Sequence, residues 1–232
     1  MRISQKPDSS ITVDQSQYVK DINAITLSCN RRLQTEDVVT EDEGQSLRAV
    51  IGGLQHAAVN SRPDLCSRLG WLQSNINRAK VSTLIEANRT LHEANQYSEV
   101  ALRVQPIPLE HVRFLAFSDA SFASEKNHDS HQGMMIMATH KGIGENRRSP
   151  VNPIAWHSEK IQKVAVSTLS AEAMALSGAV DMLSWIRLYW AWICDQRCDW
   201  RRADDTLLRL PAAFSALHSH LSLLVTPRCL IV

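Results

Sequence analysis

The sequence predicts an α/β protein with a mostly helical first half, followed by a three-stranded antiparallel meander and one long helix. Two observations lead to this fold class. In the first half, apolar residues recur three and four positions apart, which is the period of a helix face. After Pro108, short unbroken apolar runs separated by polar, glycine-containing loops replace that period, as expected of strands. The composition, 44% apolar and 21% charged over 232 residues, is that of a globular protein.

In the first half, residues 10–14 alternate in polarity and predict a strand that leads into a short helix. The polar, acidic stretch 30–45 predicts a solvated loop. Apolar stripes then predict three successive helices over residues 45–95. Thr83 and Glu86 have the spacing of a capping box at the start of the third helix.

In the second half, three apolar runs predict the strands of the meander. They cover residues 112–117, 134–138 and 153–156. A long apolar-rich stretch follows and predicts a helix over 167–193, capped by Ser167 or Thr168. Pro106 and Pro108 indicate a domain boundary near residues 103–110.

Charge and cysteine content restrict the classes of function. The formal net charge is +1, so any contact with nucleic acid has to depend on local patches. The five cysteines are odd in number and scattered, and no signal peptide or membrane-spanning run is recognised. An intracellular protein, cytoplasmic or nuclear, is expected.

Two acidic residues are the candidate catalytic and metal-binding groups. Asp119 closes the first strand of the meander, and Glu172 lies near the start of the long helix. Carboxylates on a strand end and on a helix packed against that sheet can converge on a hard cation such as Mg²⁺. The same residues also suit a turn and a helix-dipole partner, and their spacing alone does not decide.

Four sequence segments carry a family resemblance. They are F-S-D-A-S-F-A at 117–123, the glycine at 133, P-I-A-W-H-S-E-K at 153–160 and V-A-V-S-T-L-S-A-E-A at 164–173. In order and spacing they resemble the ribonuclease H domain of copia-type retrotransposon Pol polyproteins, and W-I-R at 185–187 echoes a later motif of that domain. The resemblance implies a ribonuclease H-like fold that cleaves RNA in RNA–DNA hybrids with two Mg²⁺. Asp119 and Glu172 match the first two metal-binding carboxylates of that family.

The first half is similar to the end of the copia-type reverse transcriptase. The similarity rests on I-T-V-D-Q-S-Q-Y at 11–18, L-R-A-V-I-G-G-L-Q at 47–55 and S-R-P-D-L at 61–65. It implies a thumb- or connection-like remnant over residues 1–105, a truncated ribonuclease H-like domain over 106–200, and a divergent, poorly packed tail over 201–232. In an intact element the rest of a Pol polyprotein would be a partner.

The departures from the family bear on activity. The paired aspartates of the polymerase site are absent, and after Trp200 no strand carries the family's third aspartate. The ribonuclease H-like fold is therefore expected to be incomplete, with weak Mg²⁺ binding and little or no cleavage. The sequence does not decide whether the chain is an enzyme.

Basic residues around the third strand are the candidate contacts to an RNA–DNA hybrid or another nucleic acid. They are Arg147, Arg148, Lys160 and Lys163. In the family this region faces the hybrid, so the four residues suit phosphate contacts; they also suit a solvated charge cluster.

Further features have two readings each. The tryptophans of the long helix and beyond, at 185, 190, 192 and 200, suit core packing or base stacking. His128 and His131, like Cys194 and Cys198, have spacings that suit a polar loop or surface at least as well as a metal site. Two whole-protein alternatives also stay open: a non-catalytic nucleic-acid-binding remnant, and an unrelated helical interaction protein.

Overall fold

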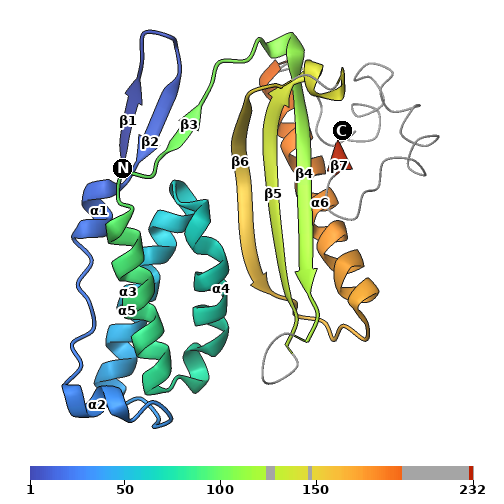
Figure 1. Cartoon of the computed structure of the whole chain (residues 1–232). Coiled ribbons are helices and arrows are strands. Elements are labelled where there is room, and N and C mark those ends of the chain that lie inside the picture. Colours follow the sequence, from blue (N-terminus) through green and yellow to red (C-terminus); the bar gives the residue numbers. More distant parts are fainter. Residues whose placement is uncertain (124–128, 146–147, 195–229, 232) are drawn as a thin grey trace. The chain divides into compact units, whose positions relative to one another are not determined.

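A computed structural model describes residues 1–123, 129–145, 148–194 and 230–231 (Figure 1). The chain divides into two compact units. The first comprises Met1–Pro106 with Trp156–Gln162, and the second comprises Ile107–Ala155 with Lys163–Val232. No helix among the described residues is long and apolar enough to cross a membrane.

A small antiparallel sheet opens the first unit. Its strands are β1 (Arg2–Gln5), β2 (Ile11–Asp14) and β3 (Leu102–Val104), in the order β1-β2-β3. The strand predicted at 10–14 is confirmed as β2. The tight turn before it is fixed by the Asp8 carboxylate, which accepts hydrogen bonds from the backbone N–H and the hydroxyl of Ser10.

Between β2 and β3 the chain forms five helices and two 3₁₀ turns. They are α1 (Ser16–Lys20), α2 (Cys29–Leu33), α3 (Glu41–Asn60), the turn Pro63–Leu65, α4 (Cys66–Asn75), the turn Ile76–Arg78 and α5 (Val81–Gln96). The three helices predicted over 45–95 are confirmed as α3, α4 and α5. Their apolar stripes meet in one core, where Leu47, Leu54, Leu69, Leu72 and Leu84 are fully buried.

The acidic stretch 30–45 was predicted as a loop, and the structure corrects this at both ends. Helix α2 covers its beginning, and α3 starts at Glu41. Thr40 and Glu43 form a capping box: the Thr40 hydroxyl accepts from the Glu43 N–H, and the Glu43 carboxylate accepts from the Thr40 N–H. The acidic residues thus lie at the positive end of a helix, which stabilises them there.

The predicted capping box at Thr83 and Glu86 is also misplaced. Helix α5 begins at Val81, three residues before the start that an N-cap at Thr83 would give, and the Thr83 hydroxyl accepts a hydrogen bond from the Lys80 N–H at 3.2 Å. Thr83 is therefore the third residue of the helix, and Lys80 is the N-cap.

The second unit contains the predicted meander and long helix. The elements are β4 (Val112–Ser121), β5 (His131–His140), β6 (Val151–Lys160), α6 (Thr168–Cys194) and the two-residue strand β7 (Leu230–Ile231), with 3₁₀ turns at Leu109–His111 and Lys141–Glu145. The strand order is β6-β5-β4-β7, with β4 antiparallel to β5 and to β7 (Figure 1). Within β6, residues 151–155 group with the second unit and 156–160 with the first. The expected α/β architecture is present, with each strand of the meander longer than its apolar run.

Helix α6 packs on the sheet through small residues. Ala171, Ala175, Ala179 and Leu183 follow each other four residues apart and are buried, so one face of α6 approaches the sheet closely. At the other end Trp190 meets Phe114 of β4 edge to face, with ring centroids 5.9 Å apart. Of the two predicted caps, Ser167 and Thr168, Ser167 has this role, because its hydroxyl accepts a hydrogen bond from the Ser170 N–H at 3.1 Å.

Of the two interpretations of the tryptophans, core packing fits one of the three that are described in α6. Trp190 is partly buried against the core, whereas Trp185 is 57% and Trp192 is 50% exposed. The helix buries a single face, and these two side chains lie outside it. Trp200 is outside the described residues.

Candidate functional site

Asp119 lies on β4, two residues before the end of the strand, rather than closing it as expected. Its side chain is exposed, and it pairs in register with Gly133 of β5. The pairing of β4 with β5 runs without interruption from Val112 to Ser121, so the strand contains no bulge that would turn the side chain.

Strand alternation fixes the face to which Asp119 belongs. Val112, Phe114 and Ala116 share a buried cluster with Leu183 of α6, so the even-numbered residues of β4 face that helix. Successive side chains point to opposite faces of a sheet. Asp119 is therefore directed to the face away from α6, and Ser118 occupies the neighbouring position on the α6 side.

Glu172 lies in the second turn of α6, next to the buried Ala171, and is half-buried. Both candidate acids belong to the same unit. The Asp119 side chain is directed to the face of the sheet away from the helix that carries Glu172. Their sharing of one cation stays a prediction. Among the residues that the structure describes, no group of three or more His, Cys, Asp or Glu side chains is arranged to hold a metal ion.

The candidate phosphate contacts flank β6. Arg148 precedes the strand and is exposed, Lys160 ends it and is half-buried, and Lys163 follows it and is exposed. Arg147 lies outside the described residues. Between them, the His157 imidazole lies 3.0 Å from the Glu159 carboxylate on the surface of the strand.

The other candidate metal ligands are only partly described. His131 is the first residue of β5, and Cys194 is the last, exposed residue of α6. Their sequence partners His128 and Cys198 lie outside the described residues. Of the remaining thiols, Cys66 is partly buried, and burial raises its pKa to about 11, which keeps it protonated and unreactive.

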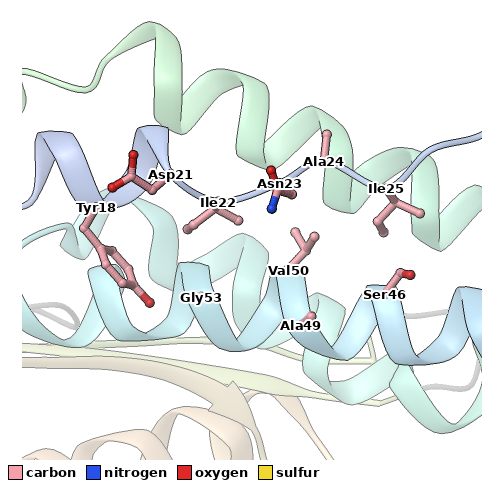
Figure 2. A pocket seen from close by; sticks show the side chains of 10 residues that line it. All are labelled: Tyr18, Asp21, Ile22, Asn23, Ala24, Ile25, Ser46, Ala49, Val50 and Gly53. Atoms are coloured by element: carbon pink, nitrogen blue, oxygen red, sulfur yellow. The ribbon is translucent and has the colours of Figure 1, made fainter.

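A pocket that sequence reasoning did not indicate lies in the first unit, between α3 and the segment that follows α1 (Figure 2). Its volume is about 380 Å³. The lining residues are Tyr18, Asp21, Ile22, Asn23, Ala24, Ile25, Ser46, Ala49, Val50 and Gly53. The Asp21 carboxylate points away from α3 in Figure 2 and accepts a hydrogen bond from the Gln17 amide. The pocket lining therefore combines apolar and polar side chains, and Asp21 is its one charged residue.

One side chain secures the wall of this pocket. The amide of Asn88 on α5 accepts a hydrogen bond from the Ile25 N–H and donates one to the Ile25 carbonyl, both at 2.8 Å. A segment outside helices and strands otherwise lacks partners for its backbone groups. These two hydrogen bonds satisfy both the N–H and the C=O of Ile25. A short-range sequence pattern does not reveal it, because Ile25 and Asn88 are far apart in the chain.

Comparisons with protein families, with curated proteins and with solved structures found no match for this chain. The function has to be inferred from the motifs and their placement on the fold.

Proposed function

We propose that the chain is a fragment of a copia-type retrotransposon Pol polyprotein, whose ribonuclease H-like part does not cleave RNA–DNA hybrids. The observation that carries the proposal is the order of the motif-bearing elements. S-D-A-S ends β4, Gly133 lies in β5, P-I-A-W-H-S-E-K forms most of β6, and V-A-V-S-T-L-S-A-E-A leads into α6. A three-stranded antiparallel meander followed by a long helix is the arrangement that the resemblance implies.

The geometry of the acids supports the absence of cleavage. A two-metal phosphodiesterase needs several carboxylates around two ions about 3.5–4 Å apart. The direction of Asp119, away from the helix that carries Glu172, disfavours a shared cation. In the sequence after Trp200 the two aspartates, Asp204 and Asp205, do not follow an apolar run of the kind that predicts a strand.

The proposal is tested with a labelled RNA–DNA hybrid in millimolar Mg²⁺. Wild type, Asp119→Asn, Glu172→Gln and Asp181→Asn are compared, the last being a matched control because Asp181 is an exposed acid of the same helix. All four proteins are expected to leave the hybrid intact. Cleavage by wild type and by the control, lost in the Asp119 and Glu172 variants, would show a complete active site and contradict the proposal.

Hybrid binding without cleavage is a second candidate function, favoured by the exposed Arg148 and Lys163 on either side of β6. Fluorescence anisotropy of labelled hybrid measures it directly. Binding that weakens in Arg148→Ala and Lys163→Ala, but not in the exposed N-terminal variant Arg89→Ala, would support it. The absence of binding to any nucleic acid would favour the unrelated interaction protein instead.

A further inference from the structure

Two histidine side chains contact each other at one end of the sheet in the second unit. His111 ends the 3₁₀ turn before β4, and His140 is the last residue of β5. The His140 Nε2 atom lies 3.0 Å from the His111 Nδ1 atom, and the rings meet edge to face with centroids 4.7 Å apart. Val112, next to His111, pairs in register with His140, so the β4–β5 ladder holds the two half-buried side chains in place.

The backbone of Gly142 decides which nitrogen of His140 carries a proton. The Gly142 N–H donates a hydrogen bond to the His140 Nδ1 atom at 3.1 Å. A ring nitrogen that accepts a hydrogen bond carries no proton, so His140 is neutral and protonated on Nε2. The Nε2–H then donates to His111 Nδ1, which also carries no proton. This chain of two hydrogen bonds therefore requires both imidazoles to be neutral.

A further proton has no place in this arrangement. Of the four ring nitrogens, two carry a proton and two accept a hydrogen bond. A proton on His140 Nδ1 would face the Gly142 N–H, and a proton on His111 Nδ1 would face the His140 Nε2–H. In either case two donors oppose each other and one hydrogen bond is lost. Gly142 is buried, and a Cβ added to it would lie 3.3 Å from His140 Nδ1, so its backbone is held against the ring.

The elements around the pair provide no carboxylate that compensates for a charged imidazole. They are the two 3₁₀ turns, the start of β4, the end of β5, the residues before β6, and α6 from Leu183 to its end, where Trp190 packs on Phe114. The titratable and charged residues of these elements are Glu110, Arg113, Lys141, Glu145, Arg148, Arg187, Tyr189 and Cys194. Among the residues that the structure describes, no acidic side chain pairs with either imidazole, whereas His157 on β6 has Glu159 beside it.

The tail predicted over 201–232 touches this region only further along β4. Leu230 and Ile231 form β7 and pair with Ala116 and Leu115. The other residues of that tail lie outside the described residues, so its predicted poor packing stays a prediction.

The same geometry disfavours a metal ion between the two rings. A cation would need the lone pair of His140 Nε2, and the proton of that ring would then have to move to Nδ1. Metal-binding histidines donate their second N–H to an acceptor. Here the second nitrogen faces another donor, the Gly142 N–H.

We propose that His111, His140 and Gly142 form a pH-sensitive clasp, which holds the start of β4 to the end of β5 and opens when either imidazole takes up a proton. Histidine is the side chain whose charge ordinarily changes between pH 5 and 8. In the unfolded chain both histidines take up protons freely over this range, whereas in the folded chain each proton removes a hydrogen bond. The unfolded state therefore binds more protons, and stability falls as the pH decreases. The clasp precedes β4, whereas Asp119 lies near the far end of that strand, so the two sites are separate.

The test compares urea unfolding of the full chain at pH 8 and at pH 5.5, followed by tryptophan fluorescence. In the double variant His111→Asn with His140→Gln, carboxamides replace the imidazoles with hydrogen-bonding groups that do not titrate. Between the two pH values the unfolding equilibrium constant of wild type should rise roughly 10- to 100-fold more than that of the double variant, about tenfold for each histidine that stays neutral in the folded chain. His92→Gln is the matched control, because His92 is an exposed histidine on α5, and it should retain the wild-type pH dependence.

Nitrogen-15 NMR of the wild-type imidazoles is a second route that needs no variant. At pH 8 both rings should carry their proton on Nε2, and on acidification the Gly142 amide resonance should move together with the signals of His111 and His140. A proton on His140 Nδ1 at pH 8, or equal pH dependence of unfolding in wild type and the double variant, would overturn the proposal. One equivalent of Zn²⁺ that shifts the signals of both rings at pH 7.5 would also overturn it, because the pair would then be a metal site.

Discussion

At the scale of single residues, the adjacent glycines of α3 have different surroundings. A Cβ at Gly53 would lie 3.1 Å from the nearest side-chain carbon of Ile22, whereas a Cβ at Gly52 would meet no atom within 4 Å. Gly52→Ala should raise the free energy of unfolding by roughly 0.5–1 kcal/mol through helix propensity. Gly53→Ala should lose that gain, because Ile22 has to move from the pocket wall, and end about 1 kcal/mol or more below Gly52→Ala. Urea unfolding followed by circular dichroism measures both, and equal stability of the two variants would contradict this account of Gly53.

Glu43 links the start of α3 to α2. Its pKa is lowered to about 2, chiefly by hydrogen bonds from the Arg31 guanidinium and then from the Thr40 N–H. Because the folded-state pKa lies below the ordinary value of 4.5, this contribution to stability is present above about pH 5 and is lost as the pH falls toward 2. Glu43→Gln should cost on the order of 1–3 kcal/mol at pH 7 and very little near pH 2.

The control for Glu43 is Glu41→Gln, which removes the same charge from the same helical turn. Glu41 is 83% exposed, and its carboxylate lies 3.7 Å from Arg48. Exposed pairs of this kind contribute little, so the control should change stability by less than about 0.5 kcal/mol at either pH. Urea unfolding at pH 7 and at low pH provides the comparison. A Glu43→Gln penalty that persists at low pH would show that packing, not charge, explains it.

At the scale of elements, the spacing of apolar residues and the length of apolar runs were sufficient to predict the long helices and strands. The helices α3, α4, α5 and α6 and the meander follow from apolar spacing. The strands β1 and β3 were not predicted, because β1 contains a single apolar residue, Ile3, and β3 is only three residues long, so neither shows a period of two. The acidic start of α3 was misread because a run of charges was taken as solvated loop, although the capping pair Thr40 and Glu43 was present in the sequence.

The candidate site shows a different limit of sequence reasoning. The motif identified Asp119 and Glu172, yet the face of β4 that meets α6 was not readable from the strand. Both sets of alternate residues in β4 are apolar, with Phe114 and Ala116 on one side and Leu115 on the other, and all three are buried. When both faces of a strand are apolar, its sequence does not show which face meets the helix, and only the packing partner decides this.

At the scale of the whole molecule, the near-neutral charge and the placement of the acids lead to an expectation for Mg²⁺. A ligand that binds only the folded state stabilises it by RT ln(1 + [L]/Kd). On the proposed function, Mg²⁺ lacks the several carboxylates that offset its dehydration, and it should bind with a Kd on the order of 10 mM or weaker. At 5 mM Mg²⁺ the gain is then no more than about 0.2 kcal/mol, which shifts a melting temperature by less than about 1 °C. Calorimetry of wild type and Asp119→Asn, each with 5 mM Mg²⁺ and with an equal ionic strength of KCl, should give the same small shift in both proteins. A rise of several degrees that is specific to Mg²⁺ and absent from Asp119→Asn would mean that Asp119 belongs to a formed metal site, and the proposed lack of cleavage would then lose its physical basis.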